Sequence, residues 1–318
     1  MQNAQTALDK VVILGTGGTI AGTASDAGDT VGYTAGQLGV AQLVAVVPAL
    51  TGQPLEAEQV AQLDSKDMRF QVWLALATRL AHHLARPEVA GVVVTHGTDT
   101  LEETAFFLQQ LLAPTKPVVL VAAMRPATAL LADGPQNLLD AVRLARLPGA
   151  QGVLALLGGT VHAGNEVRKT HTYRLDAFGA GDAGPLAHVE ADRVRVLRPW
   201  PAPRAGAAER LARLQAAPQP WPWVEIVTSG AGVGGRAVQA LQAAGVSGLV
   251  AAGTGNGTLH EELEAALRTA EAAGVPVLRC SRCLAGSVIE VPGALPAAGA
   301  LTPQQARVAL LLRLLQVD

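Results

Sequence analysis

The sequence predicts an α/β protein in which a large N-terminal domain, with a mostly parallel doubly wound sheet, precedes a smaller C-terminal α/β domain. Short apolar segments alternate with helical patterns, which is typical of parallel sheets that helices cover on both faces. A proline-rich stretch at 199–222 interrupts this alternation, which then resumes. We therefore expect an N-terminal domain over 1–198, a linker over 199–222 and a C-terminal domain over 223–318.

The expected strands are short, apolar and rich in β-branched residues. Strands of this composition are covered on both faces, because a half-exposed strand would alternate apolar with polar residues. Along the chain they fall at 11–14, 91–95, 117–122, 153–157, 224–228, 249–252 and 276–279.

Helices are expected between these strands, and several have a recognisable start. A Ser or Thr side chain before a helix can accept hydrogen bonds from the first free N–H groups, and a Glu or Gln three residues later completes a capping box. The candidate starts are Ser65, Thr100 with Glu103, Thr258 with Glu261, and Thr302 with Gln305 after Pro303.

Composition limits the classes of partner. The chain has 318 residues, 49% of them apolar, which is enough for a sizeable core. A formal net charge of −2 without a basic patch gives no reason to expect nucleic acid or a membrane, so the expected partner is a small molecule. No apolar stretch reaches transmembrane length, and the first residues lack the apolar segment of a signal peptide. We expect a cytoplasmic protein, with a signal peptide already removed as the alternative.

Two of the predicted strands run into glycine-threonine turns, VVILGTGGTIAG at 11–22 and GVVVTHGTDTLEET at 91–104. The turns carry Thr19 in the first and Thr98 with Asp99 in the second. Ligands of open α/β sheets bind beyond the carboxyl ends of the strands, and the N–H groups of such turns favour negative charge. Two hydroxyls delivered in this way suggest nucleophilic chemistry on a substrate that develops an oxyanion.

A loop at 22–36, GTASDAGDTVGYTAG, follows the first turn directly. Its composition and place suggest a mobile lid with Tyr33 as its only aromatic residue, and a solvated surface loop is the alternative. A threonine hydroxyl needs a base or an activating charge, for which Lys169 and Tyr33 are candidates. Taken alone, Lys169 would be read as a surface lysine.

Other motifs fit the sequence less well. A dinucleotide site needs G-x-G-x-x-G, and Ile20 stands where the third glycine should fall. His96 could belong to a Ser-His-Asp triad, but no G-x-S-x-G elbow exists, so we interpret it as structural. Cys280 and Cys283 form C-x-x-C without a helix behind them or further metal ligands nearby, which favours two reduced thiols. We therefore expect no metal and no cofactor.

The turns belong to a set of motifs that resembles the bacterial L-asparaginase family, which includes glutaminase-asparaginases. The resemblance covers nearly the whole chain, and the first two of its motifs together are highly specific. The motifs are TGGTIAG at 16–22, THGTDTLEETAFFL at 95–108, SKDM at 65–68, AMRP at 123–126, ADGPQNL at 132–138, GNG at 255–257 and SR at 281–282.

The resemblance implies roles for the residues of both turns. Thr19 is similar to the family's nucleophile, which forms an acyl-enzyme with the side-chain carbonyl of the substrate. Tyr33 matches the lid tyrosine that hydrogen-bonds this threonine. Thr98, Lys169 and Asp99 match a Thr-Lys-Asp triad, and Asp99 would also hold the α-ammonium group of the substrate.

Further residues match the family's substrate-binding positions. Ser65 would bind the α-carboxylate, and the backbone carbonyl of Ala123 would face the leaving amide. Lys66 replaces a glutamine that touches substrate, where it could strengthen carboxylate binding, alter the Asn/Gln preference or point away. Thr258 replaces an Asn or Ser that reaches into a neighbouring subunit's site, and Glu290 matches an acidic residue contributed across subunits to the lid tyrosine.

The implied activity is hydrolysis of L-asparagine to L-aspartate and ammonia by a homotetramer built from dimers. A glutaminase-asparaginase with relaxed amide specificity is one alternative. A non-catalytic amino-acid-binding protein on the same fold is the other, although a sensor would have no reason to keep both threonines and the lysine.

Overall fold

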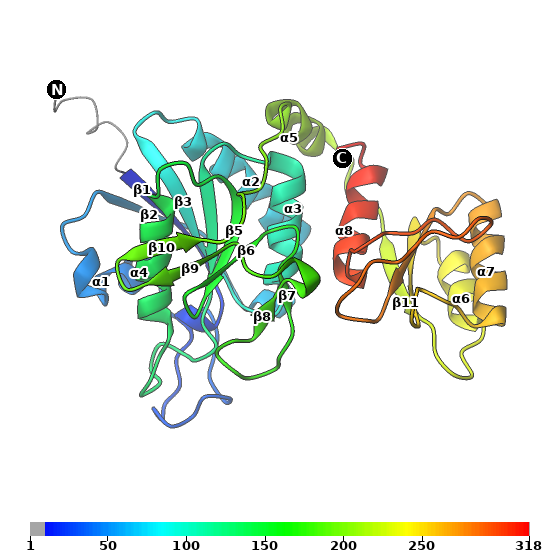
Figure 1. Cartoon of the computed structure of the whole chain (residues 1–318), viewed down its shortest axis with the longest axis horizontal. Coiled ribbons are helices and arrows are strands. Elements are labelled where there is room, and N and C mark those ends of the chain that lie inside the picture. Colours follow the sequence, from blue (N-terminus) through cyan, green and yellow to red (C-terminus); the bar gives the residue numbers. More distant parts are fainter. Residues whose placement is uncertain (1–9, 318) are drawn as a thin grey trace. The chain divides into compact units, whose positions relative to one another are not determined.

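The computed structural model describes residues 10–317, and its contacts divide the chain into two compact units between Leu211 and Ala212 (Figure 1). Helix α5 (Ala207–Ala216) runs across this boundary, inside the stretch expected to be a linker. Each unit is built around its own parallel sheet. The α/β class and the larger N-terminal part are therefore confirmed.

The first unit contains an eight-stranded sheet in the order β10-β9-β6-β5-β4-β3-β1-β2. Strands β2, β1, β3, β4 and β5 are parallel, while β6, β9 and β10 extend the sheet as antiparallel strands, and β7 and β8 form a separate hairpin. The bounds are β1 Lys10–Gly17, β2 Leu55–Leu63, β3 Val89–Thr95, β4 Pro117–Val121, β5 Gly152–Leu157, β6 Thr160–Ala163, β7 Arg168–Lys169, β8 Phe178–Gly179, β9 Ala187–Glu190 and β10 Arg193–Val196.

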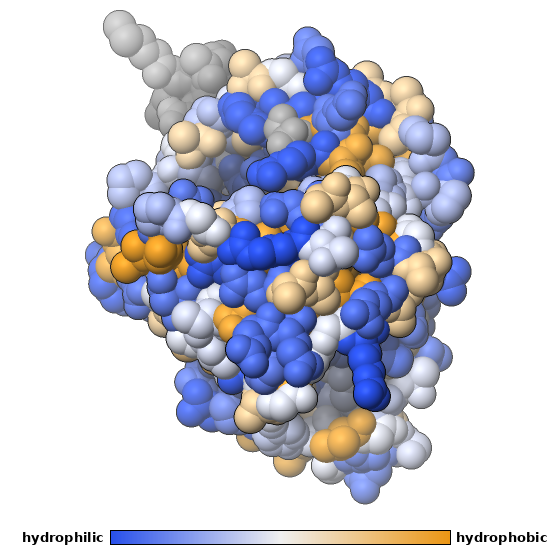
Figure 2. All heavy atoms as spheres, turned by 90° about the vertical axis from the view of Figure 1, so that its right-hand side faces the viewer, coloured by the Kyte–Doolittle hydropathy of each residue, from blue (hydrophilic) through white to orange (hydrophobic). Residues whose placement is uncertain are grey.

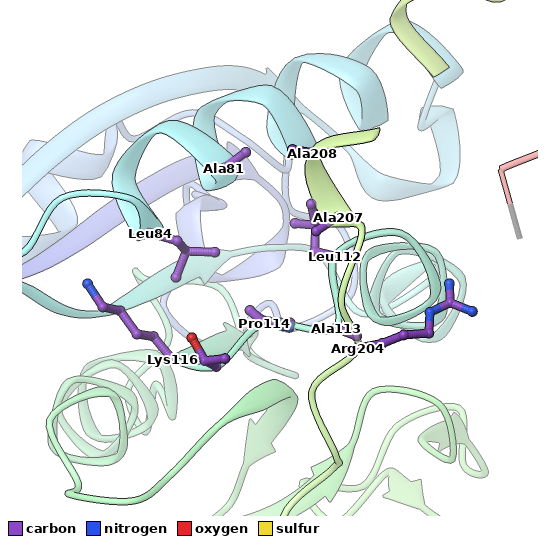
Figure 3. Close-up of a pocket in the computed structure, with 10 residues that line it drawn as sticks. Ala81, Leu84, Leu112, Ala113, Pro114, Lys116, Arg204, Ala207 and Ala208 are labelled. Carbon is purple, nitrogen blue, oxygen red and sulfur yellow. The ribbon is translucent and has the colours of Figure 1, made fainter. Parts of the chain in front are cut away.

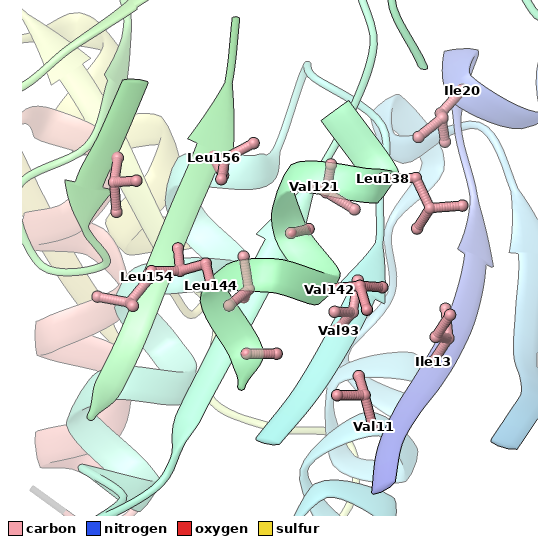
Figure 4. Packing of buried hydrophobic residues seen from close by; sticks show 14 of the residues in the cluster. Val11, Ile13, Ile20, Val93, Val121, Leu138, Val142, Leu144, Leu154 and Leu156 are labelled. Carbon is pink, nitrogen blue, oxygen red and sulfur yellow. The ribbon is translucent and has the colours of Figure 1, made fainter. Parts of the chain in front are cut away.

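Helices cover both faces of this sheet, as the apolar strands predicted. On one face, α1 (Val40–Ala45) and α4 (Gly134–Ala145) bury apolar side chains against alternate residues of the strands, such as Val11 and Ile13 of β1 (Figure 4). On the other face lie α2 (Phe70–Leu84) and α3 (Leu101–Leu112), which are joined by stacking of Trp73 on Phe107 with ring centroids 4.7 Å apart. Short 3-10 turns lie at Thr19–Ala21, Pro48–Leu50, Ser65–Asp67 and Gly181–Ala183.

The second unit has the three-stranded parallel sheet β11-β12-β13. Helices α6 and α7 pack with the apolar cluster on one face, and α8 packs against all three strands. No helix within residues 10–317 is long and apolar enough to cross a membrane. The bounds are β11 Val224–Thr228, α6 Arg236–Ala243, β12 Gly248–Gly253, α7 Glu261–Ala272, β13 Val277–Ser281 and α8 Pro303–Leu314.

All the predicted strands are confirmed. Of the predicted helix starts, those at Thr100 and Thr302 are correct in position, but only Thr302 caps its helix. Thr302 caps α8 in a full capping box with Gln305. Before α7 the capping side chain belongs to His260, so the Thr258 prediction is wrong. Before α2 the side chain of Asp64 caps a 3-10 turn, and the helix begins later, at Phe70.

The predicted capping box at Thr100 is also wrong. Thr100 is the residue before α3, but its hydroxyl donates to the backbone carbonyl of Ser65 at 2.8 Å instead of capping the helix. Ser65 in turn accepts a hydrogen bond from the backbone N–H of Asp99 at 3.2 Å. Both hydroxyls therefore tie the turn after β2 to the turn after β3.

Candidate active site

The two glycine-threonine turns meet at the carboxyl ends of the adjacent parallel strands β1 and β3. Gly18 has a φ of +83°, and a Cβ there would collide with the backbone of Gly97. A Cβ on Gly97 would in turn collide with the side chain of Ser65. Only glycine allows this close approach. It lies where the strand order reverses between β1 and β3, which is the usual ligand position in such sheets.

Thr19 opens the 3-10 turn after β1 and is buried. Its Oγ1 lies 2.7 Å from the hydroxyl oxygen of Tyr33, as the resemblance implied. Tyr33 belongs to the lid loop (residues 22–36), whose two arms pair at Thr23 and Thr34. The carboxylate of Asp29 accepts hydrogen bonds from the N–H groups of two following residues and shapes the tip of the loop.

A second group of polar side chains lies around Thr98. Lys169 donates from Nζ to Thr98 Oγ1 at 2.9 Å and to Asp99 Oδ1 at 2.7 Å. The lysine side chain is 22% exposed and the aspartate side chain 51%, so the carboxylate remains open to a ligand. The three residues proposed as a triad are thus in direct contact.

The lid loop and the strand pair that carries the lysine are also linked. We call residues 168–179 the Lys169 hairpin, because β7 and β8 pair within it. Tyr173 lies between the two strands of this hairpin. Its hydroxyl oxygen is 2.7 Å from the hydroxyl oxygen of Thr30, which is in the lid loop. This contact joins the element that carries Tyr33 to the element that carries Lys169.

Lys66 extends beside Ser65 and pairs with acidic neighbours. Its Nζ lies 2.6 Å from Asp64 and 3.4 Å from Asp67. The hydrogen bond to Asp64, followed by its charge and by Asp67, raises the pKa of Lys66. A role for Lys66 in substrate binding stays a prediction.

The turn after β4 holds Ala123, which is fully buried. Asp133 accepts hydrogen bonds at 3.0 Å from the backbone N–H groups of Met124 and Arg125, and Asn137 donates to the carbonyl of Ala122 at 2.9 Å. Asp133 and Asn137 come from the ADGPQNL motif, to which the sequence alone assigned no role. They fix the backbone on both sides of Ala123 and thereby the direction of its carbonyl.

Two of the predicted site residues, Thr258 and Glu290, lie in the second unit, while the others lie in the first. Thr258 forms a 2.8 Å hydroxyl contact with Thr254 in the turn after β12. Asn256, in the same turn, bonds through its amide to both the N–H and the carbonyl of Ile289. This amide places the segment of Glu290 next to the turn of Thr258.

Two buried titratable side chains flank Thr98 and Asp99 in sequence. Burial lowers the pKa of His96 to about 4, so this ring is neutral, and its Nδ1 lies 2.7 Å from the carbonyl oxygen of Gly97. Burial raises the pKa of Glu102 to about 7. Glu102 is a residue that sequence reasoning missed, since a Glu in a first helical turn is ordinarily exposed.

No group of three His, Cys, Asp or Glu side chains within residues 10–317 is arranged to hold a metal ion. Cys280 is buried and Cys283 exposed, both as free thiols, and burial raises the pKa of Cys280 to about 12. An apolar cavity of about 290 Å³ lies between α2, the connection from α3 to β4, and α5, and no residue of the two turns lines it (Figure 3). None of the predicted site residues lines this cavity.

The fold is that of a defined class of amidohydrolases, the asparaginases. Residues 10–202 match the family model for the N-terminal domain of asparaginase, and residues 223–317 match the model for the glutaminase/asparaginase C-terminal domain. The chain belongs to the asparaginase family.

Similar proteins match over nearly their whole length. L-asparaginase 2 of Escherichia coli (strain K12) is 39% identical, with 98% of this chain and 90% of the relative covered. A glutaminase-asparaginase of Pseudomonas fluorescens biotype A is 35% identical, with 98% and 87% covered. The crystal structure of a probable cytoplasmic L-asparaginase from Campylobacter jejuni matches with a TM-score of 0.88 at 36% identity and covers 98% of this chain and 96% of its own.

Proposed function

We propose that this protein hydrolyses L-asparagine to L-aspartate and ammonia through an acyl-enzyme on Thr19. The observation that carries the proposal is the placement of Thr19 against Tyr33 beside the contact of Lys169 with Thr98 and Asp99. The family membership and the names of the relatives, which include L-asparaginases and glutaminase-asparaginases, support it.

The charges around the turns complement an amino-acid amide. The exposed carboxylate of Asp99 suits the α-ammonium group, since a charge-assisted hydrogen bond is about twice as strong as a neutral one. The hydroxyl of Ser65 and the N–H groups at the start of helices suit the α-carboxylate. The carbonyl of Ala123 suits an N–H of the leaving amide.

The reaction would proceed in two halves. Thr19 Oγ1 attacks the side-chain carbonyl of the substrate, and the hydroxyl proton passes to the hydrogen-bonded side chains. N–H groups of the turns stabilise the oxyanion that forms, and each such donor is worth about 3 kcal/mol. Collapse breaks the C–N bond, and the nitrogen leaves as ammonia after gaining a proton. Water then attacks the ester, which releases aspartate and restores the Thr19 hydroxyl. In this proposal Lys169 and Thr98, which are hydrogen-bonded to each other, move the protons.

Ammonia release tests the proposal. We expect kcat/KM to be higher for L-asparagine than for L-glutamine or D-asparagine, in keeping with the L-asparaginases among the relatives. Comparable values for the two L-amides would establish a glutaminase-asparaginase. Saturable aspartate binding without any ammonia release would establish an amino-acid-binding protein instead.

We further propose that the protein is a homotetramer built from dimers, in which Thr258 and Glu290 complete the site of a neighbouring subunit. Ile289 and Val291, on either side of Glu290, are 71% and 54% exposed, and a subunit contact at this segment would cover both side chains. On the face drawn in Figure 2, hydrophobic side chains form separate patches on a largely hydrophilic surface. A monomeric mass in analytical ultracentrifugation would exclude the assembly.

A cytoplasmic location is likewise a proposal. The solved relative from Campylobacter jejuni is described as cytoplasmic, whereas a curated relative from Haemophilus influenzae is named as periplasmic. Fractionation of the native host, with ammonia release as the marker, decides between the two compartments.

The link between the lid loop and the Lys169 hairpin leads to a testable prediction. Tyr173→Phe and Thr30→Val each remove one hydroxyl from the 2.7 Å contact. Each variant should lower kcat/KM for L-asparagine about two- to tenfold, the range for one neutral hydrogen bond. Because both act on one contact, the double variant should be no worse than either single variant. Additive losses would show that the hydroxyls act separately.

A further inference from the structure

The position of Lys169 depends on a short piece of secondary structure. The strand that carries it has only two residues, and Lys169 pairs there with Phe178 alone. Its long side chain must nevertheless deliver Nζ to two oxygens at 2.9 and 2.7 Å. A side chain with four torsions reaches a fixed point reproducibly only when its backbone is fixed as well.

Glu102 supplies a fixed point for that backbone. It lies in the first turn of α3, its side chain is buried with 8% of the residue exposed, and its Oε2 accepts a hydrogen bond from the backbone N–H of Lys169 at 2.7 Å. Thr98 and Asp99 lie immediately before the same helix. The segment 98–102 therefore contacts Lys169 at both ends, its ammonium group and its backbone.

We propose that Glu102 is a positioning residue that fixes the backbone of Lys169, so that the ammonium group reaches Thr98 and Asp99 together. This inference rests on the proposed function for its kinetic consequences. A displacement of the lysine backbone by about 1 Å would break both contacts of Nζ, and a misplacement of that size can cost about 100-fold in rate. The carboxyl group does not touch the reacting atoms in this role.

The role requires a hydrogen-bond acceptor rather than a negative charge. Burial is the main cause that raises the pKa of Glu102 to about 7, while Glu103 raises it further and Arg168 and Lys169 lower it. Near neutral pH the carboxyl group is therefore partly protonated. A carboxylic acid still accepts through its carbonyl oxygen, and so does the amide oxygen of glutamine.

Three variants of the full-length protein test the proposal. Glu102→Leu keeps the approximate volume but removes the acceptor, Glu102→Gln keeps an acceptor, and Glu103→Gln is the matched control on the same helical turn. We expect Glu102→Leu to lower kcat for L-asparagine about 10- to 100-fold with KM within about threefold. Glu102→Gln and Glu103→Gln should both stay within about threefold of the wild-type kcat.

Hydrogen exchange gives a readout that does not need turnover. In the wild type and in Glu102→Gln, the amide of Lys169 should be protected, and in Glu102→Leu its exchange should speed up at least about tenfold. An unprotected Lys169 amide in the wild type would overturn the proposal, even where Glu102→Leu does not fold. So would a folded Glu102→Leu with wild-type kcat, or a Glu102→Gln as impaired as Glu102→Leu.

The same measurements separate this inference from the proposed function. A wild-type protein that releases no ammonia from L-asparagine contradicts the proposed function. The kcat values of the three variants then cannot be compared. The protection of the Lys169 amide and its dependence on an acceptor at Glu102 would then still decide whether Glu102 anchors the lysine backbone.

Discussion

Thr19→Val should lower kcat for ammonia release from L-asparagine on the order of 10⁴-fold or more, the scale seen when an enzyme loses its nucleophile. Valine has nearly the shape of threonine but lacks the Oγ1 that lies 2.7 Å from Tyr33. Folding should be preserved, because the tyrosine is only half-buried and its hydroxyl can turn to water. Steady-state kinetics and a thermal melt measure the two effects.

Thr23→Val is the matched control for this prediction. Thr23 lies four residues further along the chain, in the lid loop, is half-buried, and pairs with Thr34 through its backbone. We expect its kcat to stay within about threefold of the wild type, as for most substitutions away from a site. A Thr19→Val protein with more than a tenth of the wild-type kcat would refute the assignment of the nucleophile.

Lys169→Met should lower kcat/KM about 10²- to 10⁴-fold, the usual contribution of a proton-transfer group. The substitution removes the donor to Thr98 and the partner of Asp99, while methionine keeps the length of the side chain. Stability should change little, because the carboxylate left without its partner is half-exposed and can be hydrated. Steady-state kinetics of ammonia release and a thermal melt of the variant measure the two effects.

Lys10→Met provides the comparison for the lysine. Lys10 stands at the start of β1, at the opposite end of the strand from the turn, and its Nζ lies 3.5 Å from Glu56. Its removal takes away one partly exposed ion pair, which is typically worth less than about 1 kcal/mol. Equal activity of Lys169→Met and Lys10→Met would mean that Lys169 takes no part in the reaction.

The sequence predicted the interior of the fold better than its edges. Strands such as β1 and β3 are continuous apolar runs, and that composition is itself the consequence of two covered faces. Strand β2 lies at the edge of the sheet and is half-exposed, with Glu and Gln along its length, so no apolar run marks it. The antiparallel β9 and β10 have only four residues each, and β10 is mostly exposed, so neither forms a continuous apolar run.

Some residues of the candidate site could likewise be predicted from the sequence, and others could not. The turns of Thr19 and Thr98 could be predicted, because glycine and threonine at the end of an apolar strand have few other uses. Glu102 and Asn256 could not, because their partners, Lys169 and Ile289, are decided by tertiary contacts across 67 and 33 residues of chain. The prediction that Ser65 caps a helix is wrong, because its hydroxyl accepts a hydrogen bond from the backbone of Asp99 in the neighbouring turn.

The contact of Gly18 with Gly97 has a consequence for engineering this protein. Because neither position has room for even a methyl group, libraries that mutate these turns should yield almost only misfolded or inactive variants. Changes in substrate preference are therefore expected from side chains that border the turns, such as Lys66 and residues of the lid loop and the Lys169 hairpin. The contact in this way directs engineering of the protein to side chains around the two glycines, while the backbone at the glycines stays constant.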